Sequence, residues 1–89
     1  MDLAPKQLQS QDVSILKSTA EARLKNFMQD VTGRALVMME SATQGQHGIA
    51  MDLVQEAFIS LHKSYAEKTT EEWYPLFYTI LNNKLQDWR

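Results

Sequence analysis

Residues 52–65 have apolar side chains at intervals of three and four, the spacing that places them on one side of an α-helix. These side chains are Leu53, Val54, Ala57, Phe58, Leu61 and Tyr65. The other side of the same helix is polar and comprises Asp52, Gln55, Glu56, Ser60 and Lys63. Because an amphipathic helix gains most of its stability from packing, this segment requires a core formed with other elements.

A longer apolar stripe precedes it and predicts either one long helix over residues 12–42 or two helices with a bend. Gly33 is the expected bend, since glycine inside a helix costs about 1 kcal/mol relative to alanine. Residues 1–10 are predicted to form a flexible tail, ahead of a cap at Ser10 or Asp12. The stripe consists of Val13, Leu16, Ala20, Leu24, Phe27, Met28, Val31, Ala35, Met38 and Met39.

Two connections separate the predicted helices. The first, residues 43–48, contains two glycines, and a helix from Ile49 or Ala50 to Tyr65 follows it. The second, residues 66–70, precedes a third helix. The sequence therefore predicts an all-α fold, a compact domain of three or four helices over residues 11–89, with a long first helix and two shorter ones.

The third helix has a start signal and one irregularity. Thr69 and Glu72 have the spacing of a capping box. Pro75 lacks the N–H that a helix interior needs, which predicts either a start near Trp73 or a distorted first turn. The predicted apolar face comprises Trp73, Leu76, Phe77, Ile80, Leu81, Leu85 (or the stem of Lys84) and Trp88.

The other face of this helix is rich in amides and aromatics. It comprises Tyr74, Tyr78, Thr79, Asn82, Asn83, Gln86 and Arg89. Amides, aromatic rings and an arginine at this spacing are suited to hydrogen-bonding and stacking on unpaired bases. On residue types alone, however, an ordinary solvated face is the favoured interpretation.

Composition limits the function further. The 89 residues allow one small domain, and 44% hydrophobic with 22% charged residues is typical of a globular protein. The absence of cysteine excludes disulfides and thiolate metal sites, and no cofactor or metal is expected. A net charge of −2 disfavours nonspecific nucleic-acid binding but allows recognition of bases by a few polar side chains. Without a signal peptide or a membrane-spanning run, the chain is expected to be cytoplasmic.

Two motifs resemble region 2 of bacterial RNA polymerase sigma factors of the sigma-70 family, extracytoplasmic-function subfamily. The segment 52–58, DLVQEAF, is similar to the family's D-L-V-Q-E-x-F. The segment 73–83, WYPLFYTILNN, resembles F-x-x-W-L-Y-x-I-A-x-N, and residues 87–89 resemble its D-W/L-R ending. Leu76 and Phe77 depart from the family's Trp and Leu, and Pro75 is not typical there.

The resemblance implies a transcription initiation factor with two working surfaces. One binds the clamp coiled coil of the largest polymerase subunit, and its candidate residues are Asp52, Gln55, Glu56, Ser60 and Lys63. The other binds the non-template strand of the promoter −10 element, with a base flipped out. Its candidate residues are Lys68, Thr69, Tyr78, Asn82, Asn83, Gln86 and Arg89. The family also suggests an anti-sigma factor as a further partner and a second DNA-binding domain beyond residue 89.

Two other classes of function were compared with this one. A helical protein–protein adaptor fits the acidic balance and the lack of Phe or Tyr in the connection after Tyr65. An enzyme is not expected, because the sequence has no glycine-rich phosphate loop, no metal-ligand spacing and no nucleophile beside a base. The adjacent Glu71 and Glu72 are better explained by the positive start of a helix than by acid–base catalysis.

Overall fold

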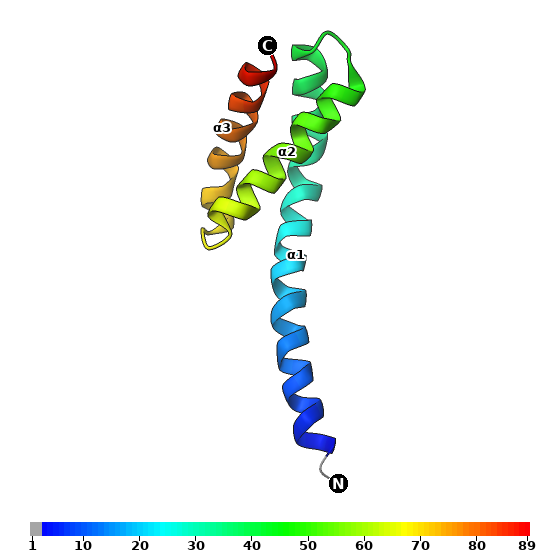
Figure 1. Ribbon diagram of the computed structural model, residues 1–89, viewed down its shortest axis with the longest axis vertical. Coiled ribbons are helices and arrows are strands. Elements are labelled where there is room, and N and C mark those ends of the chain that lie inside the picture. Colours follow the sequence, from blue (N-terminus) through cyan, green and yellow to red (C-terminus); the bar gives the residue numbers. More distant parts are fainter. Residues whose placement is uncertain (1–2) are drawn as a thin grey trace.

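The computed structural model describes the backbone of residues 3–89 and the side chains of residues 21–89. Three helices follow one another along the chain: α1 (Leu3–Ala42), α2 (His47–Tyr65) and α3 (Thr70–Trp88) (Figure 1). The predicted all-α fold with a long first helix and two shorter ones is confirmed. Residues 3–89 form three helices, and a fourth is not found among them.

The long helix α1 differs from its prediction at two points. It begins at Leu3 rather than near Ser10, and it continues without interruption through Gly33 (Figure 1). Pro5 lies in the first turn, where a backbone N–H would lack a helical partner in any case, so proline does not delay the start. At Gly33 the neighbouring Val31 and Ala35 are fully buried, so packing outweighs the cost of glycine.

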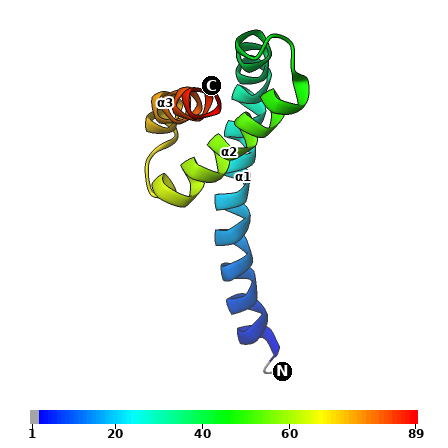
Figure 2. The same ribbon diagram turned by 45° about the horizontal axis from the view of Figure 1, so that its top comes forward.

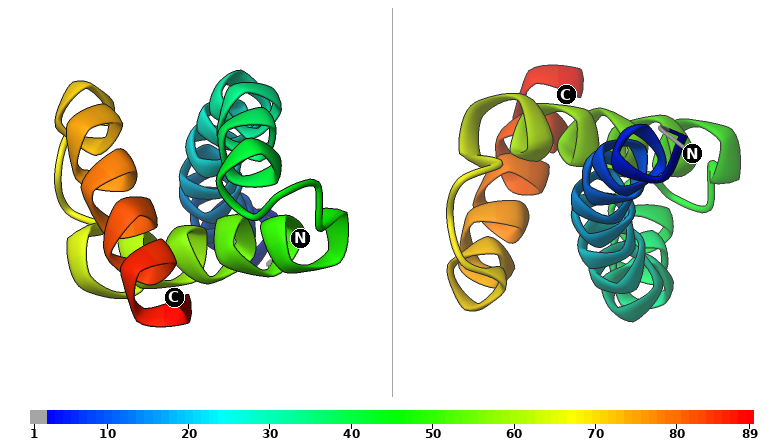
Figure 3. Two further views of the ribbon diagram at one scale, coloured as in Figure 1. Left: turned by 90° about the horizontal axis from the view of Figure 1, so that it is seen from above. Right: turned by 90° about the horizontal axis from the view of Figure 1, so that it is seen from below.

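The three helices form a bundle from which the N-terminal part of α1 projects. Helix α2 contacts both α1 and α3 and crosses them obliquely, as Figures 2 and 3 show. The principal extents of 63 × 22 × 19 Å reflect this projection. Helix α2 is thus the element on which the other two are assembled.

Phe27 of α1 lies at the centre of an aromatic core. Its ring makes edge contacts with Phe58 (6.2 Å between centroids), Trp73 (5.3 Å) and Phe77 (5.7 Å). Aromatic pairs in such geometry contribute about 0.5–1.5 kcal/mol beyond their area burial. The buried apolar side chains are Phe27, Val31, Ala35, Met39, Ala50, Leu53, Val54, Ala57, Phe58, Leu61, Trp73, Phe77, Leu81 and Leu85.

Two predicted core residues are exposed, and both predictions are wrong. On α1 the buried positions Phe27, Val31, Ala35 and Met39 advance in steps of four, so the buried line winds around the helix as α2 crosses it. Met38 lies off this line and is 48% exposed. Trp88 is the last residue of α3 and is 41% exposed, because no described residue covers that end. The side chains of Val13, Leu16 and Ala20 lie outside those that the structure describes.

A tight turn joins α1 to α2 and lets α2 begin at His47, earlier than predicted. Gly45 N donates to Glu40 O (2.6 Å) and Gln44 N donates to Ser41 O (3.3 Å), the hydrogen-bond pattern of a Schellman motif. Gln44 occupies its left-handed position with φ 61°, where glycine is usual. Thr43 is fully buried, and its hydroxyl donates to Met39 O at 2.7 Å. The hairpin is therefore closed by backbone geometry rather than by a flexible linker.

Candidate functional site

Three polar residues of the D-L-V-Q-E segment form an exposed ridge on α2, which we call the α2 ridge: Asp52, Gln55 and Glu56. Leu53 and Val54, which lie between them in sequence, are 4% and 3% exposed. Burial of these two side chains fixes the rotation of α2 about its axis. The ridge residues are consequently directed away from the core.

The other two polar candidates on α2 differ in exposure. Lys63 is exposed, whereas Ser60, which precedes the buried Leu61 in sequence, is only partly exposed. A long Lys63 side chain is therefore available to a partner, and the Ser60 hydroxyl less so. The predicted polymerase-binding residues thus lie on one helix, and all of them except Ser60 are exposed.

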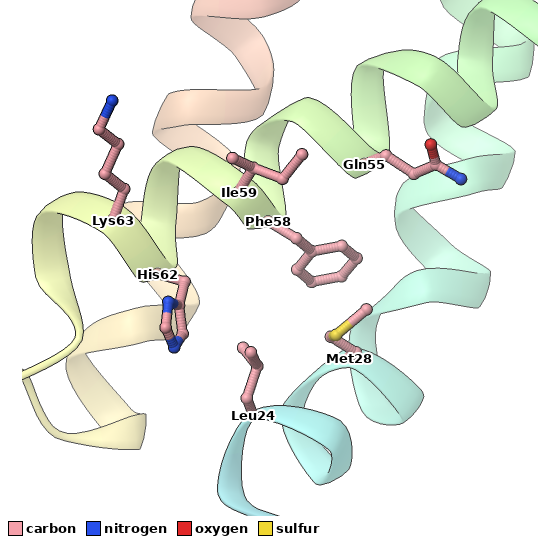
Figure 4. A pocket seen from close by; sticks show the side chains of 7 residues that line it. All are labelled: Leu24, Met28, Gln55, Phe58, Ile59, His62 and Lys63. Atoms are coloured by element: carbon pink, nitrogen blue, oxygen red, sulfur yellow. The ribbon is translucent and has the colours of Figure 1, made fainter. Parts of the chain in front are cut away.

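An apolar groove runs beside the α2 ridge, between α1 and α2, with a volume of about 550 Å³. Figure 4 shows Leu24 and Met28 of α1 and Phe58 of α2 directed toward the same space. Gln55, Ile59, His62 and Lys63 complete the lining along α2 (Figure 4). The groove joins an apolar surface to part of the predicted polymerase-binding set.

Ile59 is the residue of this surface that the sequence analysis missed. It is 65% exposed, and it lies one helical turn from Gln55 and one from Lys63. The available signal was a large β-branched side chain in the middle of an otherwise polar line. An exposed apolar side chain beside a groove is typical of interaction surfaces.

Arg23 of α1 holds the connection between α2 and α3. Its Nε lies 3.0 Å from Thr70 Oγ1, its Nη1 donates to Ala66 O at 3.4 Å, and its Nη2 donates to Lys68 O. The guanidinium carbon lies 4.0 Å from the centroid of the Trp73 ring, a cation–π contact. No motif in the sequence marked Arg23, because its partners lie more than 40 positions away.

The connection is also held from its α3 side. Trp73 Nε1 donates to Tyr65 O (2.7 Å), and Lys68 N donates to the same carbonyl (3.0 Å). The Lys68 side chain itself is exposed. The connection is thus short and fixed, with one cationic side chain on its surface.

Thr69, one of the predicted DNA-binding residues, caps α3. Glu72 N donates to Thr69 Oγ1 (3.2 Å) and Thr69 N donates to Glu72 Oε2 (3.3 Å), so the predicted capping box is confirmed. Helix α3 therefore begins at Thr70, and the alternative start near Trp73 is wrong. The missing N–H of Pro75 leaves only the carbonyl of the exposed Glu71 without its helical donor, where water is accessible.

The polar line of α3 comprises Tyr78, Asn82 and Gln86, one helical turn apart, with Arg89 following at the cap. Asn82, Gln86 and Arg89 are exposed, whereas Tyr78 is half-buried. The ring of Tyr78 packs edge-on against Phe77, with centroids 5.3 Å apart. The tyrosine therefore presents only part of its ring to a ligand.

Asn83 and Tyr74 lie apart from this line in different ways. Asn83 is exposed but turned about 100° around the helix from Asn82. Tyr74 packs edge-on on Phe27 (5.0 Å between centroids), and its hydroxyl donates to the Asp30 carboxylate. This hydrogen bond, partial burial and the charge of Asp30 raise the pKa of Tyr74 above its usual value.

Comparison with known proteins assigns no family to this chain: no family model, no curated protein and no solved structure matches it. Within residues 3–89, none of the helices has the length and apolar character needed to cross a membrane. Among the side chains of residues 21–89, no group of three or more His, Asp or Glu is arranged to hold a metal ion. The geometry of the α2 ridge, the groove and the polar line of α3 is therefore the basis for the functional proposal.

Proposed function

We propose that this chain is a region 2-like domain of an extracytoplasmic-function sigma factor, which binds core RNA polymerase and helps to open the promoter −10 element. The observation that carries the proposal is the exposure of Asp52, Gln55 and Glu56 on α2 while Leu53 and Val54 between them are buried. The same DLVQE segment carries the resemblance to the family. An orientation with the three polar side chains in the core would have removed the binding surface.

The α2 ridge has the chemistry to bind a basic helical partner, which the resemblance identifies as the clamp coiled coil of the largest polymerase subunit. The two carboxylates and the amide oxygen of the ridge accept hydrogen bonds from lysine and arginine side chains. Ile59 and the groove beside it supply apolar contact area, which charged pairs at a surface do not. Lys63 lies at the far end of the same line and is suited to an acidic residue of the partner.

The polar line of α3 has the chemistry to bind an unpaired DNA strand. Amide groups of Asn82, Asn83 and Gln86 can hydrogen-bond to base edges once the strands separate. Lys68 and Arg89 lie at opposite ends of α3 and are suited to phosphates. Binding of unpaired bases favours the open state of the promoter by population shift, without a covalent step.

The second candidate is a helical adaptor with this fold and no DNA role. It is favoured by one observation: the two tyrosines of α3, Tyr74 and Tyr78, pack partly against the core and so offer little free ring surface for stacking. An adaptor would use the α2 ridge and the groove alone.

The polymerase-binding part is tested by titrating the chain and its variants against core RNA polymerase. We expect Gln55→Ala and Glu56→Ala each to weaken binding about tenfold, as loss of charge-assisted hydrogen bonds predicts, while thermal stability is unchanged. Asp87→Ala, which removes an exposed carboxylate near the end of α3, is the matched control. Equal polymerase affinity of wild type and all three variants would exclude the α2 ridge as the polymerase-binding surface.

The DNA-binding part is tested with the protein in complex with core polymerase. Asn83→Ala and Asn82→Ala should lower promoter opening while polymerase affinity is retained. A single-stranded oligonucleotide with the preferred −10 sequence should compete with the promoter. An adaptor, in contrast, would bind polymerase without any effect of the oligonucleotide.

A further inference from the structure

The strongest unassigned feature is the set of contacts around Arg23, whose guanidinium meets one hydroxyl, two backbone carbonyls and one indole ring. We infer that Arg23 is a positioning residue that fixes the α2–α3 connection, residues 66–69, in the conformation that binds the unpaired DNA strand. The inference rests on the proposed function and names a residue of α1, outside both resemblance motifs.

The planar fork of arginine suits this position. Three nitrogens of one rigid group reach Thr70 Oγ1, Ala66 O and Lys68 O, so that one side chain satisfies both ends of the connection. The flat guanidinium simultaneously covers the Trp73 ring at 4.0 Å. A lysine has its three donors on one ammonium and has no plane, so it cannot reproduce the fork that reaches all three acceptors while covering the Trp73 ring.

The consequence for binding is preorganisation. Lys68 and Thr69 belong to the predicted DNA surface. Arg23 donates hydrogen bonds to the backbone carbonyl of Lys68 and to the hydroxyl of Thr70, which follows Thr69. Without Arg23, the connection would have to be ordered at the moment of binding, and that loss of conformational entropy would subtract from the affinity. Because the α2 ridge lies on the exposed side of α2, removal of Arg23 leaves its side chains unchanged.

The test compares Arg23→Ala and Arg23→Lys with Lys25→Ala. Lys25 is a residue of α1 with the same charge, and it is exposed and lines a different groove with Glu21 and Gln29. Hydrogen exchange of the amides of residues 66–69 reports the order of the connection. Trp73 emission, measured in a Trp88→Phe background, reports the loss of the cation over the ring. We expect faster exchange and altered emission in both Arg23 variants and neither change in Lys25→Ala.

The functional measurement uses the chain bound to core RNA polymerase. The wild-type complex first selects its preferred sequence from duplexes that contain a randomised single-stranded bubble, and the variants are then compared on this DNA. We expect Arg23→Ala to weaken retention of this DNA at least tenfold, Arg23→Lys to resemble it, and both to bind polymerase within twofold of wild type. Should Arg23→Ala not fold, Arg23→Lys decides.

The other outcomes distinguish failure of the positioning role of Arg23 from failure of the proposed function. If both Arg23 variants retain the DNA like wild type, or lose polymerase affinity to the same extent as DNA affinity, the positioning role is wrong and the proposed function stands. If Arg23→Lys retained the DNA as well as wild type, the positive charge alone would be sufficient, and the positioning role of Arg23 would also be wrong. If the wild-type complex retains no bubble DNA, the DNA part of the proposed function fails and this inference fails with it.

Discussion

Phe58 of α2 and Phe77 of α3 stack with ring centroids 4.5 Å apart and an interplanar angle of 23°. Phe27 of α1 meets both rings edge-on, so the three helices share one aromatic junction. The α2 ridge and the polar line of α3 are attached to the two helices that this stack joins. Their relative placement therefore depends on a buried contact rather than on the connection alone.

Replacement of Phe77 by alanine should destabilise the domain by about 3–5 kcal/mol, because it removes a fully buried ring and leaves a cavity. Urea denaturation followed by circular dichroism measures this change. Trp88→Ala is the control, and since Trp88 is 41% exposed we expect a loss of less than about 1 kcal/mol. Equal losses for the two variants would contradict the described core.

Replacement of Ile59 by serine should weaken polymerase binding at least tenfold, because burying an isoleucine side chain contributes about 1.5–3 kcal/mol. The folded state should be affected by no more than about 0.5 kcal/mol, since the side chain is exposed. Val37→Ser is a matched control, with a β-branched side chain of similar exposure on α1 (67% against 65%). Loss of affinity in the Val37 variant as well would indicate a nonspecific apolar effect.

Replacement of Thr69 by alanine should destabilise the domain by about 1 kcal/mol, because the amide of Glu72 loses its acceptor in the capping box. Thr69→Ser keeps the oxygen and should retain most of the stability. Thermal unfolding of the two variants measures the difference. A Thr69→Ser variant as unstable as Thr69→Ala would show that the methyl group, not the cap, matters.

Replacement of Gln44 by glycine should stabilise the domain by up to about 1 kcal/mol, because Gln44 holds a left-handed backbone conformation at φ 61°. The same change at Gln29, an exposed position inside α1, should have the opposite sign and cost about 1 kcal/mol. Chemical denaturation of the two variants compares them. Destabilisation by Gln44→Gly would argue against the Schellman geometry of the turn.

Replacement of Tyr74 by phenylalanine gives a pH-dependent prediction. The hydrogen bond to Asp30, burial and the nearby carboxylate charge raise the pKa of Tyr74, so the folded state favours the protonated phenol. This stabilisation is present below about pH 10, the unfolded value, and is lost as the pH rises through the higher folded value. Urea titrations from pH 7 to 11 should therefore show a constant difference between wild type and Tyr74→Phe that shrinks above pH 10. In an Asp30→Asn background the pH dependence should become smaller, because only the contribution of burial to the raised pKa of Tyr74 remains.

Local patterns in the sequence were sufficient for much of the site. The spacing of Leu53, Val54 and Phe58 predicted which side of α2 is buried, and hence the exposure of Gln55 and Glu56. The capping box at the start of α3 was equally readable, because it involves residues three positions apart. Each of these features depends on the geometry of a single helix or a single turn.

Other features were decided by the way the helices cross. A helical period defines the apolar side of one helix, but it does not determine where a partner helix ends or at what angle it passes. For that reason Met38 and Trp88 are exposed, and Ile59 borders a groove between α1 and α2. Arg23 meets carbonyls more than 40 residues away only because α1 passes beside the α2–α3 connection. The sequence by itself thus determined the helices and their polar sides, whereas the tertiary structure determined the groove and the fixed connection, since both arise from contacts between segments distant along the chain.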